Sequence, residues 1–190
     1  MDNPAMNAFR TSAPAAAMIA IVAMTRLLPH WPNFTPIMAV ALCGGALFAN
    51  RLQSLVVALS AMVLSDMALG LVFGMDYAIH TTQLWVYGCV VATALLGHAL
   101  RNASTTRQVL LGGTISSIGF FVVTNFAVWV HGTFYPQTVE GLLACYAAGL
   151  AFYRDSGNFL INGMFSTYMF SLIIIFISKA LPAPETALEK

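Results

Sequence analysis

Residues 51–73 read RLQSLVVALSAMVLSDMALGLVF, and this stretch decides the fold class of the chain. After Arg51 its only ionisable residue is Asp66, and Gly74-Met75-Asp76 follows its end. A helix that crosses the hydrocarbon core of a bilayer needs about 20 consecutive, predominantly apolar residues. The stretch therefore predicts a transmembrane helix.

Five further apolar stretches, separated by prolines, glycines or charged residues, have the same character. The predicted spans cover residues 14–28, 35–49, 52–73, 82–100, 109–130 and 158–178. The first follows Arg10 as a signal peptide would, but Arg26 comes soon after it and no clear cleavage site separates it from the next span. We therefore assign it as a transmembrane helix. The second is shorter than a bilayer needs, so its neighbours must shelter it.

The composition agrees with this reading. Hydrophobic residues make up 59% of the 190 residues and charged residues 8%, whereas soluble domains carry about 25% charged residues. Lipid must therefore cover most of the surface. The net charge of +1 predicts no nucleic-acid partner. The three cysteines, Cys43, Cys89 and Cys145, lie in apolar stretches, which favours packing over a disulfide or a metal site.

Residues 138–153 lie between the fifth and sixth predicted spans, and their apolar residues recur at helical spacing. We interpret them as a helix in the membrane interface; the alternative is a seventh span. The predicted fold is thus an all-α integral membrane protein, a compact bundle of six transmembrane helices plus this interfacial helix. It forms one transmembrane domain, residues 1–190, with a flexible cytoplasmic tail at 180–190.

The distribution of arginine and lysine favours six spans over seven. With the N-terminus inside, most cations fall on the cytoplasmic side, as the positive-inside rule expects: Arg10, Arg51, Arg101, Arg107, Lys179 and Lys190. Only Arg26 and Arg154 lie outside. Both termini are therefore predicted to be cytoplasmic.

In this topology the polar residues that could form a site collect on the outer side. Asp66 is the most informative, because a charge at the centre of a membrane helix costs about 2.5–3.5 kcal/mol on insertion scales and normally faces a partner or water. Arg26 could lie at similar depth. Two interpretations stay open: a structural Arg26–Asp66 pair, or a ligand pocket lined by Asp66.

His80 follows the third span, and a neutral imidazole is a good ligand for a transition metal such as cobalt. The alternative is an interfacial histidine bonded to water. No G-x-S-x-G or H-E-x-x-H motif occurs, and the only lysines, Lys179 and Lys190, exclude a Walker A loop. We therefore predict no enzyme activity. A membrane enzyme using Asp66, His30 and His131, or a structural subunit with an empty pocket, is the remaining alternative.

Four motifs carry a family resemblance: residues 26–36 (RLLPHWPNFTP), 64–66 (LSD), 124–129 (TNFAVW) and 141–146 (GLLACY). With the six short spans and the alanine-rich first helix, they resemble the S components of bacterial energy-coupling factor (ECF) transporters, in the S-component-like group similar to the cobalamin-specific BtuM. The resemblance implies a multi-pass protein of the bacterial inner membrane that takes up a vitamin or cofactor. The ligand it favours is cobalamin; another small vitamin or metal-containing cofactor is the alternative.

The resemblance also implies partners and site residues. Ala16 and Ala20 would dock on the ECF coupling subunit, and separate ATPases would supply energy. No intrinsic cofactor is expected. The substrate-binding residues would be Arg26, His30, Asn33, Asp66, Tyr77, His80, Asn125 and Tyr146. In the cobalamin-specific proteins a cysteine after the third span ligates cobalt; this chain has none there, so His80 is the cobalt ligand expected if cobalamin binds.

Overall fold

The computed structural model describes the backbone of residues 4–48, 50–151 and 153–180, and side chains within 16–48, 50–151 and 153–179. The described part is helical, apart from an isolated bridge between Tyr153 and Gly157. Its elements are α1 (Pro4–Leu27), α2 (Ile37–Leu47), α3 (Arg51–Phe73), α4 (Met75–Ala78), α5 (Gln83–Ala99), α6 (Thr105–Arg107), the π-helical turn η1 (Gln108–Gly112), α7 (Gly113–His131), α8 (Val139–Leu150) and α9 (Phe159–Ala180). Residues 181–190 of the predicted tail lie outside these ranges.

Each predicted span coincides with a helix, although the bounds differ. The largest difference is at α1, which begins at Pro4 and continues through position 14. The sequence predicts a start at Pro14, so the helix is longer at its N-terminal end than predicted. The second predicted span is only 11 residues long as α2, and η1 and α7 together form the fifth.

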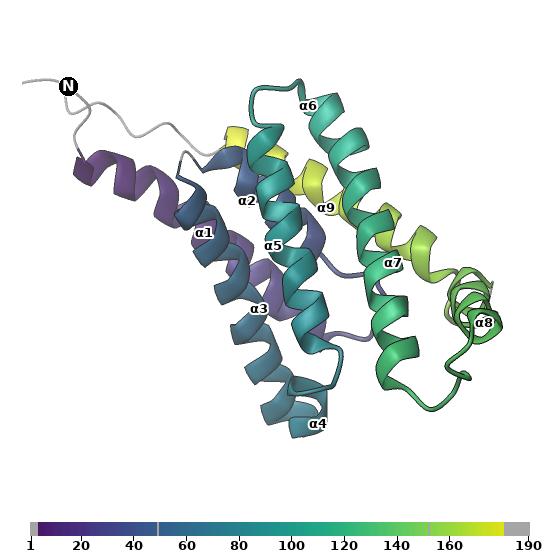
Figure 1. The fold of residues 1–190 in the computed structure, drawn as a ribbon. Coiled ribbons are helices and arrows are strands. Elements are labelled where there is room, and N and C mark those ends of the chain that lie inside the picture. The colour runs from purple at the N-terminus through teal and green to yellow at the C-terminus, as the bar shows by residue number, and fades with distance from the viewer. Residues whose placement is uncertain (1–3, 49, 152, 181–190) are drawn as a thin grey trace, which may run out of the picture.

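Four helical segments are long and apolar enough to cross a membrane: Arg51–Phe73, Met75–Ala99, Thr105–His131 and Phe159–Lys179. The shorter apolar helices are Ala16–Leu27, Ile37–Leu47 and Val139–Leu150. These long apolar helices support the prediction that the chain is a membrane protein. The 12 residues of α8 extend about 18 Å at 1.5 Å per residue, less than the hydrocarbon core, and α8 lies across the direction of α7 (Figure 1).

The short helix α2 lies in the middle of the bundle. Every residue from Ile37 to Gly45 is buried, and α2 contacts α1, α3, α5, α7 and α9. The expectation that neighbours shelter this helix is confirmed. Because 11 residues extend only about 16 Å, α2 does not fill the length of the longer helices around it.

Glycines bring α2 and α5 into backbone contact. A methyl group on Gly97 of α5 would collide with the carbonyl oxygen of Leu42, and one on Gly45 of α2 would collide with the carbonyl oxygen of Ala94. In lipid, where apolar side chains gain little by leaving the solvent, such close backbone packing is a main source of helix association. This reciprocal contact fixes α2 against α5.

The order of the helices places specific residues at each end of the bundle. The end that we call the cavity end is formed by the C-terminal ends of α1, α3 and α7, the N-terminal ends of α2, α5 and α9, and by α4 and α8 (Figure 1). Arg26 and Arg154 belong to it. Arg51, Arg101, Arg107 and Lys179 belong to the opposite end.

Gly97→Ala is expected to lower stability by more than the about 1–3 kcal/mol typical of an overpacked core, because its methyl group meets backbone atoms that cannot rotate away. Thermal unfolding in lipid nanodiscs would measure the loss. Gly88→Ala is the matched control, since Gly88 lies on the same helix with no heavy atom near its added methyl group. Equal melting temperatures for the two variants would contradict the packing.

Candidate functional site

A network of polar side chains joins α1, α3 and α5 at the cavity end. Asp66 Oδ1 accepts a hydrogen bond from Arg26 in an ion pair. Asp66 Oδ2 accepts from Gln83 Nε2 at 3.0 Å and from the Tyr87 hydroxyl at 2.7 Å. Arg26 also donates to Ser65 Oγ at 2.6 Å. We call these five residues the Asp66 cluster. The ion pair, one of the two interpretations that the sequence left open, is present.

Local sequence places each member of the cluster. Arg26 stands in the last turn of α1, where a cation offsets the partial negative charge of a helix C-terminus. Gln83 and Tyr87 are four residues apart at the start of α5, and this spacing puts them on one helix face. Gln83 also donates to the carbonyl oxygen of Ala78 at 2.5 Å. Our reading of the sequence missed Gln83 and Tyr87, although two polar residues at this spacing in an apolar helix were a usable signal.

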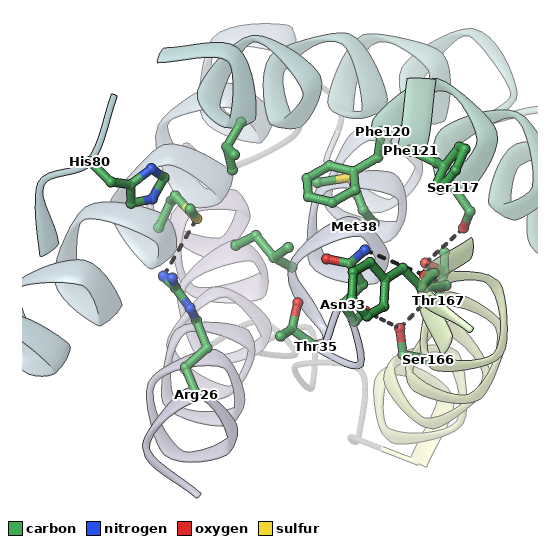
Figure 2. Close-up of a pocket in the computed structure, with 15 residues that line it drawn as sticks. Arg26, Asn33, Thr35, Met38, His80, Ser117, Phe120, Phe121, Ser166 and Thr167 are labelled. Atoms are coloured by element: carbon green, nitrogen blue, oxygen red, sulfur yellow. Dashed lines mark hydrogen bonds between the residues drawn. The ribbon is translucent and has the colours of Figure 1, made fainter. Parts of the chain in front are cut away.

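A first cavity of about 160 Å³ lies beside this cluster. Its wall combines charged, hydroxyl, amide and apolar side chains: Arg26, Asn33, Thr35, Ile37, Met38, Met62, His80, Val86, Ser117, Phe120, Phe121, Phe159, Gly163, Ser166 and Thr167. Figure 2 shows Arg26 and His80 on one side, and Ser117, Ser166 and Thr167 on the other. Met38 and Phe120 lie between them, together with Asn33 and Thr35, so the middle of the cavity combines apolar and polar side chains.

A second cavity of about 330 Å³ adjoins the first. The two share Asn33, Val86, Phe120 and Phe159 as lining residues. The remaining lining of the second cavity comes from the residue before α5, from α7 and α8, and from the segments beside α8: Thr82, Thr124, Asn125, Val128, Tyr135, Cys145, Ala148, Gly149 and Tyr153. Ligand pockets commonly measure about 300–1,000 Å³, so the adjoining pair has the size of a small-molecule site.

The segment before α2 shapes the wall that both cavities share. The amide of Phe34 donates to the carbonyl oxygen of Trp31 at 2.9 Å, which closes a turn with Pro32 and Asn33 in its middle. Asn33 has φ 61°, the conformation that asparagine tolerates better than most residues at this position of a type II turn. Asn162 of α9 holds the turn through the carbonyl oxygen of Pro32, at 3.1 Å.

The hydroxyl side of the first cavity is an ordered chain of hydrogen bonds. Ser117 Oγ donates to Thr167 Oγ1 at 3.2 Å, and Thr167 Oγ1 donates to the carbonyl oxygen of Gly163 at 2.7 Å. Ser166 Oγ donates to the same carbonyl oxygen at 3.0 Å. Since each hydroxyl oxygen carries two lone pairs, Ser117 and Ser166 keep acceptor capacity for a ligand.

The structure places the predicted site residues in three groups. Arg26, Asn33 and His80 line the first cavity, and Asn33 and Asn125 line the second. Asp66 lies behind Arg26, away from the lining. The other three line neither cavity: His30 Nδ1 contacts the carbonyl oxygen of Leu28 at 2.7 Å, Tyr77 is exposed, and the Tyr146 hydroxyl donates to the carbonyl oxygen of Val122 at 2.9 Å.

Our reading of the sequence missed several lining residues, namely Thr35, Thr82, Ser117, Cys145, Ser166 and Thr167. Single serines and threonines inside apolar helices are common, because their hydroxyls bond to the carbonyl one turn earlier, so they gave no signal. Burial raises the pKa of Cys145, which keeps this thiol in its neutral form, consistent with the packing role predicted for the cysteines.

The donors for a metal are few at these cavities. Among the described residues, no group of three or more His, Cys, Asp or Glu side chains comes together. His80 lines the first cavity with its Nδ1 3.0 Å from Thr82 Oγ1. A metal carried by a ligand would therefore find one imidazole there, and the role of His80 toward cobalt stays a prediction.

A family described as a "Family of unknown function (DUF6580)" matches residues 7–184, nearly the whole chain. The protein belongs to this family. No curated protein and no solved structure matches the chain. The matched residues include the parts of α1 to α9 that form the cavity end. The cavity end therefore belongs to the domain that defines the family.

Asp66→Ala is expected to destabilise the protein by about 3–5 kcal/mol, because it leaves the largely buried guanidinium of Arg26 without its counter-ion. The double variant Arg26→Gln, Asp66→Asn removes both charges and should recover most of that loss. The free energy of unfolding would be measured in lipid bicelles for the wild type, for Asp66→Ala and for the double variant. Arg154→Gln, a change of an exposed arginine at the same end, is the control. A double variant no more stable than Asp66→Ala would contradict the pairing.

Proposed function

We propose that this DUF6580 protein is a substrate-binding subunit for membrane transport, of the S-component kind, that takes up a small vitamin or cofactor. The observation that carries the proposal is the pair of adjoining cavities at one end of a bundle of apolar helices. Cavities with an apolar wall and a few convergent polar groups are the usual form of a small-molecule site. Their position at one end of the bundle suits a protein that collects a ligand from one side of a membrane.

The distribution of cations between the two ends of the bundle supports one orientation of the protein in the membrane. Arg51, Arg101, Arg107 and Lys179 at the end opposite the cavities would be cytoplasmic under the positive-inside rule. The cavities then open to the non-cytoplasmic side, and both ends of the chain lie in the cytoplasm. This is the orientation an uptake protein needs, because its site must meet the ligand before the ligand crosses.

The exposed residues on the outer face of α1 support the proposal that a partner helix binds there. Ala16 and Ala20 are exposed, and Met24, one turn further along, is 67% exposed. Small residues at a spacing of four let another helix approach closely in lipid. In the proposed function a coupling subunit packs on this face, and ATPases bound to that subunit supply the energy.

Cobalamin is the second candidate ligand, favoured by His80 in the wall of the first cavity. Its corrin ring with the attached nucleotide is much larger than either cavity, about 160 and 330 Å³. Binding would therefore require the helices at the cavity end to separate. A smaller vitamin or cofactor needs no such change, and for that reason we place it first.

The enzyme alternative has less support. The three groups named for it each bond elsewhere: Asp66 to Arg26, Gln83 and Tyr87, His30 to the carbonyl oxygen of Leu28, and His131 to Trp85 Nε1 at 3.1 Å. Neither cavity lining contains any of the three. A proton-transfer step at the cavities would need a different set of groups.

Gly163→Met should abolish ligand binding, because it fills the first cavity from α9; an added Cβ there has its nearest neighbour, the carbonyl oxygen of Asn33, at 3.8 Å. The assay is thermal stabilisation of the protein in nanodiscs by a panel of vitamins and cofactors, cobalamin included. At least one compound should raise the melting temperature of the wild type. Gly88→Met, the same change on an open face of α5, should keep that response.

The proposed function fails if no compound stabilises the wild type. It also fails if Gly163→Met responds to the ligand as strongly as Gly88→Met does.

A further inference from the structure

The first cavity has a distinct electrostatic character. Of the residues that line either cavity in the described part of the chain, none is an aspartate or glutamate, whereas the first is lined by the guanidinium of Arg26 and the imidazole of His80. The nearby carboxylate, Asp66, has both oxygens engaged within the Asp66 cluster. The guanidinium side of the Arg26–Asp66 ion pair therefore faces the cavity, and its carboxylate side does not line the wall.

Arg26 has donors left for a ligand. Its three hydrogen bonds, to Asp66, Ser65 and Met62, all leave from Nη1. Its Nη2 and Nε bond to none of the described residues. A guanidinium carries five N–H groups in a planar fork that matches a carboxylate. Asp66 can thus orient Arg26 while the free edge of the same fork binds a ligand.

The start of α2 adds to the positive potential. Ile37 and Met38, in its first turn, line the first cavity together with Thr35. The first intrahelical bond runs from the amide of Val40 to the carbonyl oxygen of Pro36 at 2.8 Å, and no side chain caps this end. Unpaired amides in a first turn carry the partial positive charge of a helix N-terminus. Arg26 and α2 therefore both favour an anion in this cavity.

The remaining wall limits the kind of anion. Because Asp66 already neutralises Arg26, each negative charge of a ligand adds to the net charge of the site, which favours a ligand with one negative charge over a phosphate monoester with two. Met38 and Phe120 lie between the charged side and the hydroxyl side of the cavity (Figure 2). A ligand with a carboxylate at one end, an apolar body and a hydrogen-bonding group at the other end would meet all three surfaces.

We propose that the ligand is a small monocarboxylate whose carboxylate binds the free edge of Arg26, and whose far end binds the hydroxyls of Ser117 and Ser166. This inference rests on the proposed function and names the substrate class of the same site. Asp66 acts as a positioning residue, since it touches Arg26 and not the ligand.

The test uses matched pairs that differ in charge and hardly in shape, and whose far end carries a hydroxyl that can donate to Ser117 or Ser166: 4-hydroxybenzoate with 4-hydroxybenzamide, and pantothenate with pantothenol. Calorimetry on the full-length protein in nanodiscs measures the dissociation constant of each compound. In at least one pair the carboxylate should bind about tenfold more tightly than its neutral partner, because a charge-assisted bond to arginine is stronger than a neutral one. The variant Arg26→Gln, Asp66→Asn should reduce that ratio to about one, and Arg154→Gln should keep it.

The possible outcomes separate the two proposals. Tighter binding of the neutral partners, or a carboxylate preference that persists in the double variant, overturns the monocarboxylate proposal and leaves the proposed function standing. If none of these compounds binds, the monocarboxylate proposal fails, and the wider vitamin panel then decides the proposed function separately.

Discussion

The close backbone packing of α2 on α5, with Gly45 against Ala94 and Gly97 against Leu42, is the constraint on which the rest of the structure depends. It holds a helix of 11 residues in the middle of a bundle whose outer helices reach 22–24 residues. A central helix this short cannot fill the bundle from end to end. The first cavity lies beyond the N-terminal end of α2, and side chains of the surrounding helices line it. A bulkier residue at either glycine would displace α2 and alter the cavity with it.

The Asp66 cluster ties the helices around that space together. A buried ion pair is weak evidence for stability, because desolvation of two charges offsets much of their attraction. Its value here lies in position: Asp66, held by Gln83 and Tyr87 from α5, fixes the guanidinium of Arg26 at the edge of the cavity. The network supports the structural interpretation of Asp66, because Asp66 pairs with Arg26 and lines neither cavity. Under the proposed function, Asp66 would act on a ligand only by orienting Arg26.

The helices could be predicted from the sequence because apolar length and helix-breaking residues are local signals. The same signals predicted the short second helix and a separate helix within residues 138–153. The Arg26–Asp66 pair was one of two interpretations, based on the similar depth of the two charges. The cavities could not be predicted in this way. Thr167 and Ser117 look like ordinary hydroxyl residues of apolar helices until α7 and α9 bring them together at 3.2 Å. His30, Tyr77 and Tyr146 share an end of the bundle with the cavities but line neither of them, because sequence distance to a boundary gives depth and not direction.

The central claim is that the cavity above α2 opens to the non-cytoplasmic side, and thiol labelling tests it most directly. In a protein with Cys43, Cys89 and Cys145 replaced by alanine, Thr35→Cys places one thiol in the cavity wall and Arg107→Cys places one at the opposite end. A small membrane-impermeant thiol reagent is applied to right-side-out and inside-out membrane vesicles. The expected result is labelling of position 35 in right-side-out vesicles and of position 107 in inside-out vesicles. Labelling of position 35 only in inside-out vesicles would contradict the claim, as would labelling of both positions from one side.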